Sequence, residues 1–394
     1  MKILVSGAGI GGSAAVLFLR ASGHEVVAID RAPGFSRRGY ILSLKFFGLG
    51  IMKSLGLLDE LRHFGIPYQR IQYRDGQGAL VREFSEQLAQ QATKGTVFLM
   101  RPDLHQVLYT AAAKQSPVRF GTSIAGIVQN DSVATVTFSD GHTETFDLVV
   151  ISEGLHSSSR HLLWQDEGLR RFDIIYAATI VDAAPELPFG TFQFFFAPGA
   201  TLLFMPIDEK QILLQCYFRA KLGGDHHAQQ IGELARQRCH RLPQQIRDVM
   251  ERVTSRDDIF CDSVGMVTLS DLVRQRVVVL GDAGYCPTFL SGMGASLALL
   301  GARGLDASLR QDSDDVPAAL ARYNRLMQPV IAHYQHNAQV NMERMVSNDS
   351  LHTLVHNWTL RLFPPTFIVK HMAHEFNLEA SLLQQFGIPG MNAR

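Results

Sequence analysis

The sequence predicts an α/β protein with a parallel, helix-covered sheet, a second β-sheet inserted into it and a helical C-terminal segment. Three observations support this fold class. A strand, a glycine turn and a helix open the chain, and a second strand-turn-helix pattern occupies residues 276–310. Between them, residues 173–220 are rich in β-branched and aromatic side chains, whereas the chain from residue 315 onward has the pattern of helices.

The N-terminal unit has the pattern of a β-α-β motif. The apolar run ILV predicts a strand, and residues 11–22 carry apolar side chains at helical spacing. Gly23 fits a helix C-cap, and EVVAID predicts the second strand. Further strand and helix are expected to about residue 70.

The central and C-terminal elements follow from turn and capping signals. Residues 69–84 alternate around an Asp-Gly turn, which predicts a hairpin. Residues 100–115 predict a helix with Asp103 as its N-cap, and strands with another Asp-Gly turn follow it. Residues 228–255 read as helix, and the helical C-terminal segment is interrupted by FPP at 363–365.

This order of elements predicts discontinuous domains, because the second strand-turn-helix pattern completes the sheet that the N-terminus begins. The expected nucleotide-binding domain comprises residues 1–72, 98–170 and 268–330. The inserted β-sheet domain comprises 73–97 and 171–267, and residues 331–394 form the C-terminal helical segment, a possible lid.

Composition excludes several classes of function. The chain has 394 residues, a formal net charge of zero and no basic run, so nothing favours nucleic acid as a partner. It contains no run of about 18 apolar residues, so no membrane span is expected. The histidine pairs at helical spacing lack further ligands, so no metal site is expected. The four cysteines are scattered without a CxxC pair, which predicts reduced thiols in a cytoplasmic protein: Cys216, Cys239, Cys261 and Cys286.

The first glycine turn, Gly7-Ala8-Gly9-Ile10-Gly11-Gly12, is a GxGxxG motif between a strand and a helix. Gly7 permits the tight turn, Gly9 lets the backbone approach a pyrophosphate, and Gly12 lets helix and strand pack closely. Asp30 ends the second strand, where a carboxylate accepts hydrogen bonds from ribose hydroxyls. An acid at this position argues against a ribose phosphate and therefore against NADP at this site. NAD and FAD remain.

The second glycine turn distinguishes between these two cofactors. Its strand ends in Gly281-Asp282, and Gly292 and Gly294 open a further helix. NAD enzymes need one such turn, whereas a longer dinucleotide is held at two points. The sequence therefore favours FAD, with the first turn at its adenylate end and the second at its reactive end.

A third motif, SEGLHSSSR at residues 152–160, completes a recognisable set. With GAGIGG and GDAGYCPTFLSGMGAS, it resembles the flavoprotein monooxygenases of the p-hydroxybenzoate hydroxylase type over about 330 residues. Within that class the sequence looks closest to the small bacterial members that include the tetracycline-inactivating monooxygenases. The resemblance implies FAD as cofactor, NAD(P)H as transient reductant, and hydroxylation of an aromatic or polycyclic molecule by dioxygen through a flavin hydroperoxide.

The resemblance also assigns roles to residues. Asp282 would hold the ribityl and pyrophosphate region of FAD, Pro287 would lie beside the flavin ring, and the helix that starts near Gly292 would point at its pyrimidine end. Arg101 would reach toward the cofactor, although a surface arginine in a first helical turn remains the alternative. The same alternative, a solvated loop arginine, applies to Arg31 and Arg38. The expected cofactor-binding residues are Gly7, Gly9, Gly11, Gly12, Asp30, Arg31, Arg38, Arg101, Glu153, Gly281, Asp282, Pro287, Gly292, Gly294, Ala295 and Ser296.

Three positions depart from the family pattern. Glu153 stands where the family has Asp, Ser296 where it often has Asn, and Gly301 where it often has Asp. The longer Glu153 side chain puts its direct contact with the cofactor in question. Asp306, about three turns along the same helix as Ser296, is expected at the surface and away from the cofactor.

Residues 191–219 are expected to form the floor of a substrate pocket. Phe192, Phe194 and Phe196 share one strand face, and Gln215, Tyr217 and Arg219 share a face of another. The alternative is that the phenylalanines are core and the polar row faces water. The predicted substrate residues are Phe192, Phe194, Gln215, Tyr217, Arg219 and Pro287. The amphipathic stretch 351–372 is expected to act as a lid or to pack on the core, with a membrane surface as the alternative.

Two other functions remain open at this point. An FAD-dependent reductase or dehydrogenase on the same scaffold would consume no dioxygen, and a non-catalytic flavin-binding protein would show no turnover. No side-chain nucleophile or acid–base pair is expected, because the chemistry belongs to the flavin. The chain is expected to be a monomer or a homodimer.

Overall fold

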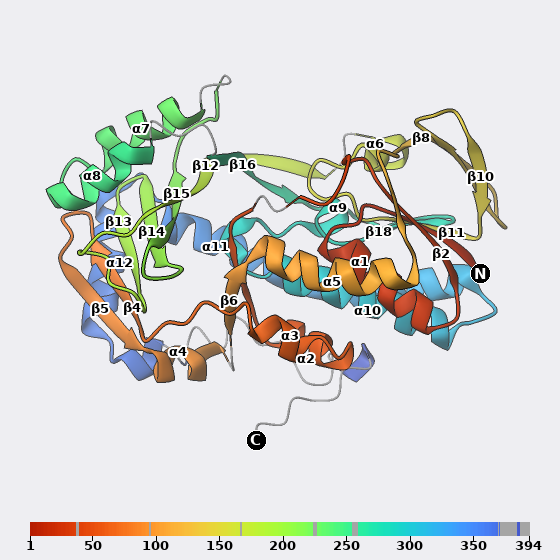
Figure 1. The fold of residues 1–394 in the computed structure, drawn as a ribbon, viewed down its shortest axis with the longest axis horizontal. Coiled ribbons are helices and arrows are strands. Elements are labelled where there is room, and N and C mark those ends of the chain that lie inside the picture. The colour runs from red at the N-terminus through yellow and green to blue at the C-terminus, as the bar shows by residue number, and fades with distance from the viewer. Residues whose placement is uncertain are drawn as a thin grey trace.

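The computed structural model describes residues 1–36, 39–93, 96–165, 168–223, 227–253, 259–368, 370 and 384–386. Figure 1 shows an elongated molecule with one sheet toward each end and a long helix, α11 (Val316–Met345), running between them. Within the described part of the chain, no helix is long and apolar enough to cross a membrane.

The first sheet carries the N-terminus and is parallel except at one edge. Its strand order is β17-β18-β11-β1-β2-β7, and only the β17–β18 pair is antiparallel. Its strands are β1 (Lys2–Ser6), β2 (Glu25–Asp30), β7 (Val118–Phe120), β11 (Leu148–Ile151), β17 (Val273–Arg274) and β18 (Val277–Val279). Segments about 270 residues apart in the chain thus share one sheet, which confirms the predicted α/β class.

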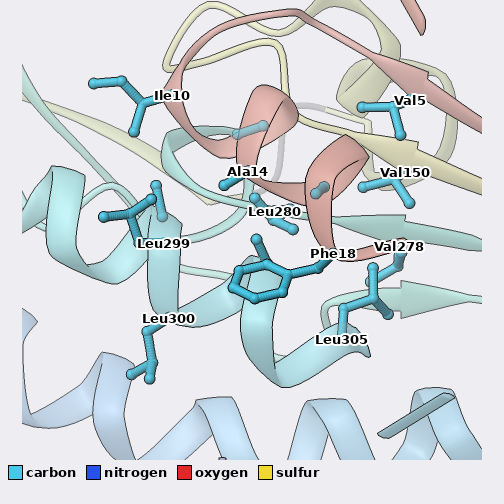
Figure 2. Close-up of a cluster of buried hydrophobic side chains, with 14 of the residues drawn as sticks. Val5, Ile10, Ala14, Phe18, Val150, Val278, Leu280, Leu299, Leu300 and Leu305 are labelled. Carbon is cyan, nitrogen blue, oxygen red and sulfur yellow. The ribbon is translucent and has the colours of Figure 1, made fainter. Parts of the chain in front are cut away.

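Helices α1 (Ile10–Ala21), α5 (Arg101–Gln115) and α10 (Gly294–Gln311) pack together over this sheet. Figure 2 shows Phe18 of α1 between the strands and the Leu299 to Leu305 stretch of α10. A buried side chain of this size contributes roughly 1.5–3 kcal/mol to folding. This packing fixes the N-termini of α1 and α10 at the carboxyl edge of the same sheet.

The second sheet has seven strands in the order β16-β12-β15-β14-β13-β4-β5, and only β13 and β4 run parallel. Helices α7 and α8 cover its outer face (Figure 1). These elements are β4 (Arg70–Asp75), β5 (Leu80–Ser85), β12 (Leu169–Asp182), β13 (Thr191–Ala197), β14 (Ala200–Pro206), β15 (Gln211–Phe218), β16 (Phe260–Val267), α7 (His227–Arg238) and α8 (Gln244–Val253). The predicted hairpin is confirmed as β4–β5, whereas the exact domain boundaries stay a prediction.

The remaining described elements include a three-stranded sheet in the order β10-β9-β8 and a two-stranded sheet of β3 and β6. They are β3 (Ile41–Leu44), α2 (Phe47–Ser54), α3 (Leu58–Arg62), α4 (Glu86–Thr93), β6 (Val97–Met100), β8 (Ile124–Gln129), β9 (Ala134–Phe138), β10 (Thr143–Phe146), α6 (Ser158–Trp164), α9 (Asp282–Tyr285), the 3-10 turn η1 (Phe289–Ser291) and α12 (Ser350–Leu362).

Two local expectations need correction. Met100, not Asp103, is the N-cap of α5, and Asp103 lies in the first turn, because Pro102 occupies one of the first two helical positions. Asp306 is fully buried, because Arg303 and Arg310 pair with it and Ser22 donates a hydrogen bond to it.

Candidate cofactor and substrate site

One cavity of about 1060 Å³ extends from the first glycine turn to α12. Ligand pockets in proteins range from about 300 to 1,000 Å³, so this cavity is large enough for a cofactor and a second molecule. Both glycine turns, the inner face of the seven-stranded sheet and the C-terminal helices contribute to its wall. The two ends of the cavity differ in chemistry and are described in turn.

Close backbone packing shapes the first glycine turn. Gly7 has a φ of +98°, and a Cβ there would lie 2.3 Å from the carbonyl oxygen of Ser152 on the neighbouring strand end. A Cβ on Gly12 would lie 1.8 Å from the carbonyl oxygen of Gly7. Gly9 is different, because a Cβ there would meet no protein atom within 4 Å and Gly9 lines the cavity. The turn therefore leaves open space at the position where a phosphate would approach the N-terminus of α1.

Polar side chains hold this turn in place. The Asp30 carboxylate accepts hydrogen bonds from the backbone N–H groups of Ala8 and Ala32, both at 2.8 Å. The His105 ring donates from Nε2 to the carbonyl oxygen of Ala8 at 2.7 Å. Burial lowers the pKa of His105, which favours the neutral ring. Asp30 lines the cavity and retains unused acceptor capacity for a ribose.

Glu153, the departure from the family pattern, is the centre of a hydrogen-bond network. Its carboxylate accepts from the hydroxyls of Ser6, Ser157 and Ser159 at 2.5–2.8 Å and from the Ser159 N–H at 3.1 Å. It thereby joins the end of β1 to the start of α6. Buried Arg160 extends this connection, because it donates to the carbonyl oxygen of Ala283 in the second turn at 2.9 Å. The third motif therefore ties the two glycine turns together.

Charged groups distinguish the second turn. Gly281 has a φ of +67°, and Asp282 follows it at the cavity wall. Burial raises the pKa of Asp282, and the nearby Arg101 guanidinium opposes that shift. Arg101 also lies over the Tyr40 ring, 5.9 Å from its centroid. The carboxylate and the guanidinium line the same cavity, as a ligand with both donors and acceptors requires.

The N-terminus of α10 faces the same region. No side chain caps it, and Gly294, Ala295 and Ala298 of its first turns line the cavity. Gly292, with a φ of +60°, precedes it, and a Cβ there would lie 3.2 Å from the Lys45 Nζ. Burial lowers the pKa of Lys45 to about 8. A helix N-terminus and an amine next to each other favour a ligand that carries negative charge.

Aromatic side chains form the far end of the cavity. Along β13 and β15, side chains alternate between the α7–α8 side and the cavity side. Phe194, Phe196, Gln215 and Tyr217 line the cavity, and both Gln215 and Tyr217 are buried. The alternative in which the polar row faces water is therefore wrong for these two residues.

Helix α12 closes this end. His352, Val355, His356, Thr359 and Leu360 of this helix line the cavity. Arg82 of β5 fixes the C-terminus of α12, since its guanidinium donates to the carbonyl oxygens of Leu360, Arg361 and Phe363 at 2.6–3.0 Å. The helix packs against β5, β13 and α11 and forms part of the cavity wall, whereas a role as a lid stays a prediction.

Most of the sequence-predicted site residues meet in this cavity. The lining residues among them are Gly7, Gly9, Gly11, Asp30, Arg31, Arg101, Glu153, Gly281, Asp282, Gly292, Gly294, Ala295, Phe194, Gln215 and Tyr217. Their roles stay a prediction.

Five predicted residues are not among the described residues that line the cavity: Gly12, Pro287, Ser296, Phe192 and Arg219. Gly12 packs on Gly7, and Ser296 donates to the backbone of Lys45 at 3.3 Å. Phe192 stacks on Tyr68, and Arg219 donates to the carbonyl oxygen of Val346 at 2.8 Å. Pro287 is buried, and its neighbours Cys286 and Thr288 line the wall in its place. Arg38 lies outside the described residues.

Sequence reasoning missed Lys45, His105, Tyr40 and Tyr176, which all line the cavity. No motif marks them, because a lone lysine, histidine or tyrosine is typical of any globular protein. The spacing signal for His105 was nevertheless present, since it lies one helical turn after Arg101. Among the described residues, no group of three or more His, Cys, Asp or Glu side chains is arranged to hold a metal ion.

Comparison with known proteins agrees with this geometry. Residues 1–333 match the family described as FAD binding domain. The FAD-dependent monooxygenase asL6 of Sarocladium schorii is 30% identical over 384 residues, covering 87% of this chain and 88% of that protein. A flavin-dependent monooxygenase of Legionella longbeachae is 25% identical over 335 residues, covering 84% of this chain and 86% of that protein.

Solved structures share the fold. Klebsiella pneumoniae HpxO complexed with FAD and uric acid has a TM-score of 0.85 at 23% identity, covering 95% of this chain and 96% of that one. The tetracycline destructase Tet(55) has a TM-score of 0.76 at 24% identity, covering 96% and 98%. At these identities the likeness concerns the fold alone.

Proposed function

Because the chain belongs to the FAD binding domain family and is an FAD-dependent monooxygenase, we propose that it hydroxylates an aromatic or polycyclic molecule bound between α12 and the seven-stranded sheet. The observation that carries the proposal is the single cavity, which joins both glycine turns to an aromatic wall. FAD, reduced by NAD(P)H, supplies the activation of dioxygen when it is bound. The protein supplies position, charge and exclusion of water.

We propose that the first turn holds the adenylate end of FAD. The open space in front of Gly9 supports this, because it is a cradle that any side chain would fill. The N-terminus of α1 would face the pyrophosphate, and Asp30 would accept from the ribose. The backbone bonds of Asp30 and His105 keep the turn in the conformation that binds.

The second turn is proposed to hold the reactive end. Asp282 would accept hydrogen bonds from the cofactor, and Arg101 would keep that carboxylate ionised despite its burial. Lys45 and the N-terminus of α10 would stabilise negative charge on the reduced cofactor. This arrangement would favour the reduced form over the oxidised form.

The substrate class follows from the aromatic end of the cavity. Phe194, Phe196 and Tyr217 give planar apolar surface, and Gln215 adds a polar tip. Such a wall suits flat, electron-rich rings, which electrophilic oxygen transfer also requires. With α12 over the opening, the site would exclude water from the reacting groups.

The test is a turnover assay on purified protein. We expect the protein to be yellow, to release FAD rather than FMN on denaturation, and to oxidise NAD(P)H faster when a phenolic or polycyclic enol is added, with matching dioxygen consumption. Turnover that proceeds equally well without dioxygen, with an artificial electron acceptor, would instead identify a reductase. A colourless protein would contradict the assignment as a whole.

We also propose a cytoplasmic location. All four cysteines are free thiols, and Cys216, Cys239 and Cys286 are buried. Unpaired thiols support a reducing compartment. Localisation of a fluorescent fusion in the source cell tests this.

A further inference from the structure

Two buried hydroxyl groups at the aromatic end of the cavity lack a hydrogen-bond partner. The Tyr176 hydroxyl and the Thr288 Oγ1 each have no partner among the residues that the structure describes. Both residues are less than 4% exposed, and both line the cavity. Buried hydroxyls are almost always hydrogen-bonded in folded proteins. Two such groups on one cavity wall therefore indicate a ligand that completes them.

The backbone at Thr288 is strained. Its φ of +81° and ψ of 158° lie in a region that β-branched residues rarely adopt. Ser291 holds this conformation, because its backbone N–H and its hydroxyl both donate to the carbonyl oxygen of Thr288, at 3.3 and 2.9 Å. The Ser291 Oγ in turn accepts from the N–H of Met293 at 3.0 Å. The loop thus maintains a costly conformation that keeps Thr288 on the cavity wall.

Tyr176 is fixed by its aromatic neighbours. Its ring stacks on Phe289 with centroids 4.7 Å apart, and Tyr40 meets it edge-on at 5.3 Å. Because Phe289 follows Thr288 in the chain, this stacking brings the two unpartnered residues to the same part of the wall. Burial holds the pKa of Tyr176 well above its usual value, so the hydroxyl stays protonated and donates.

We propose that Tyr176 and Thr288 form a substrate subsite that binds a free hydroxyl group on the aromatic ring. Tyr176 donates to the substrate oxygen, and the threonine hydroxyl accepts the substrate O–H. An ether oxygen accepts from Tyr176 but has no proton for Thr288. The subsite therefore selects phenols and enols over their alkyl ethers. This inference rests on the proposed function, because it places the substrate at the aromatic end.

Two other unpartnered hydroxyls provide matched controls. The Tyr68 hydroxyl and the Thr179 Oγ1 are also buried and unpartnered among the described residues, but neither residue lines the cavity. Tyr68→Phe and Thr179→Val remove the same groups as Tyr176→Phe and Thr288→Val. In all four variants, an atom without a partner is removed and the side-chain shape is kept. Folding and FAD content should therefore be retained.

The experiment compares 1-naphthol with 1-methoxynaphthalene as probes of the FAD-loaded protein. Dissociation constants are measured from the change in flavin absorbance or fluorescence on binding. The unmodified protein and both control variants should bind 1-naphthol at least about tenfold more tightly than its methyl ether. Tyr176→Phe and Thr288→Val should each weaken 1-naphthol binding by roughly threefold to tenfold and leave the ether unchanged.

Two results would overturn the subsite. One is unmodified protein that binds neither probe or does not distinguish them, and the other is an equal loss in the control variants. Either can occur with FAD bound and NAD(P)H oxidised normally, so failure of the subsite is separate from failure of the proposed function. Loss of FAD binding from the unmodified protein would instead contradict the function itself.

Discussion

The two glycine turns differ in the groups that surround them. The first is close-packed, since Gly7 and Gly12 leave no room for a Cβ, and the Asp30 carboxylate holds its backbone. The second places Asp282, Arg101 and Lys45 around one part of the cavity. Burial shifts the pKa of both Asp282 and Lys45 toward the neutral form. A rigid turn suits a part of the cofactor that does not change, whereas buried charges respond to a part that changes charge during turnover.

The largest effect is expected at the first turn. Gly12→Val would force a side chain into the carbonyl oxygen of Gly7, which lies 1.8 Å from the Cβ position. Because the new side chain would clash with a backbone oxygen, which cannot move aside like a flexible side chain, we expect a loss of about 4 kcal/mol or more in the free energy of unfolding. Denaturant unfolding measures it. Gly34→Val is the control, because a Cβ there meets no atom within 4 Å, and its stability should change by less than about 0.5 kcal/mol. Equal stability of the two variants would show that the first turn is not close-packed.

At the second turn, removal of the charge should affect affinity rather than folding. Asp282→Asn deletes a charged acceptor, a loss of about 1.5–3 kcal/mol. FAD affinity of the apo-protein should therefore fall by roughly tenfold to 100-fold. Fluorescence titration gives the dissociation constant. Asp314→Asn is the control, because Asp314 is exposed after α10, whereas buried Asp306 is unsuitable. An unchanged FAD affinity in Asp282→Asn would show that Asp282 does not contribute to cofactor binding.

Lys45 gives a smaller, pH-dependent effect. Its pKa of about 8 means that the amine is protonated below pH 8 before any ligand binds. An anionic reduced flavin favours the ammonium form and raises this pKa. Affinity for reduced FAD should therefore be constant below about pH 8 and fall above it, because binding must then take up a proton. Lys45→Met should remove this change of pH dependence, called the break below. It should also lower the affinity for reduced FAD by about tenfold relative to oxidised FAD. Anaerobic titrations at several pH values check it, and a break retained in the variant would exclude Lys45.

The smallest effect concerns α12, the proposed lid. Arg82→Met removes three donated hydrogen bonds from the C-terminal end of α12 but keeps the aliphatic stem. Because the site is partly exposed, we expect local opening of α12 to become easier by about 1 kcal/mol, or roughly fivefold faster amide exchange. FAD affinity should stay unchanged, since α12 lies at the other end of the cavity. Hydrogen exchange followed by mass spectrometry compares the amide exchange rates of α12 in Arg82→Met and in unmodified protein. Unchanged exchange in residues 350–362 would show that Arg82 does not anchor the lid.

The sequence predicted the backbone-determined parts of the site best. The glycines of the first turn could be predicted from the sequence alone, because only glycine fits where a Cβ would clash. The alternation along β13 and β15 likewise predicted the faces of Phe194 and Tyr217. Phe192 shares the predicted face but lies near the start of β13, where it packs against Tyr68 and does not line the cavity.

What the sequence could not predict depends on tertiary position. Lys45 reaches the second turn from the connection between β3 and α2, and His105 reaches the first turn from α5, although neither belongs to a motif. Asp306 was expected at the surface because polar residues usually are. Arg303 and Arg310, three residues before and four after it on the same helix, allow its burial. Cys286 and Thr288, on either side of Pro287, line the cavity wall, and the positive φ of Thr288 could not be predicted from its residue type.

The central claim is that the two turns hold different ends of one cofactor. The most direct test measures the dissociation constants of ADP and FMN, which represent the adenylate end and the flavin end of FAD, for apo-protein with Gly9→Val or Asp282→Asn. Gly9→Val fills open cavity space without a protein clash. It should therefore weaken ADP binding by roughly tenfold or more and leave the affinity for FMN unchanged. Asp282→Asn should do the reverse. Equal losses of both ligands in both variants, or losses in the opposite order, would contradict the account.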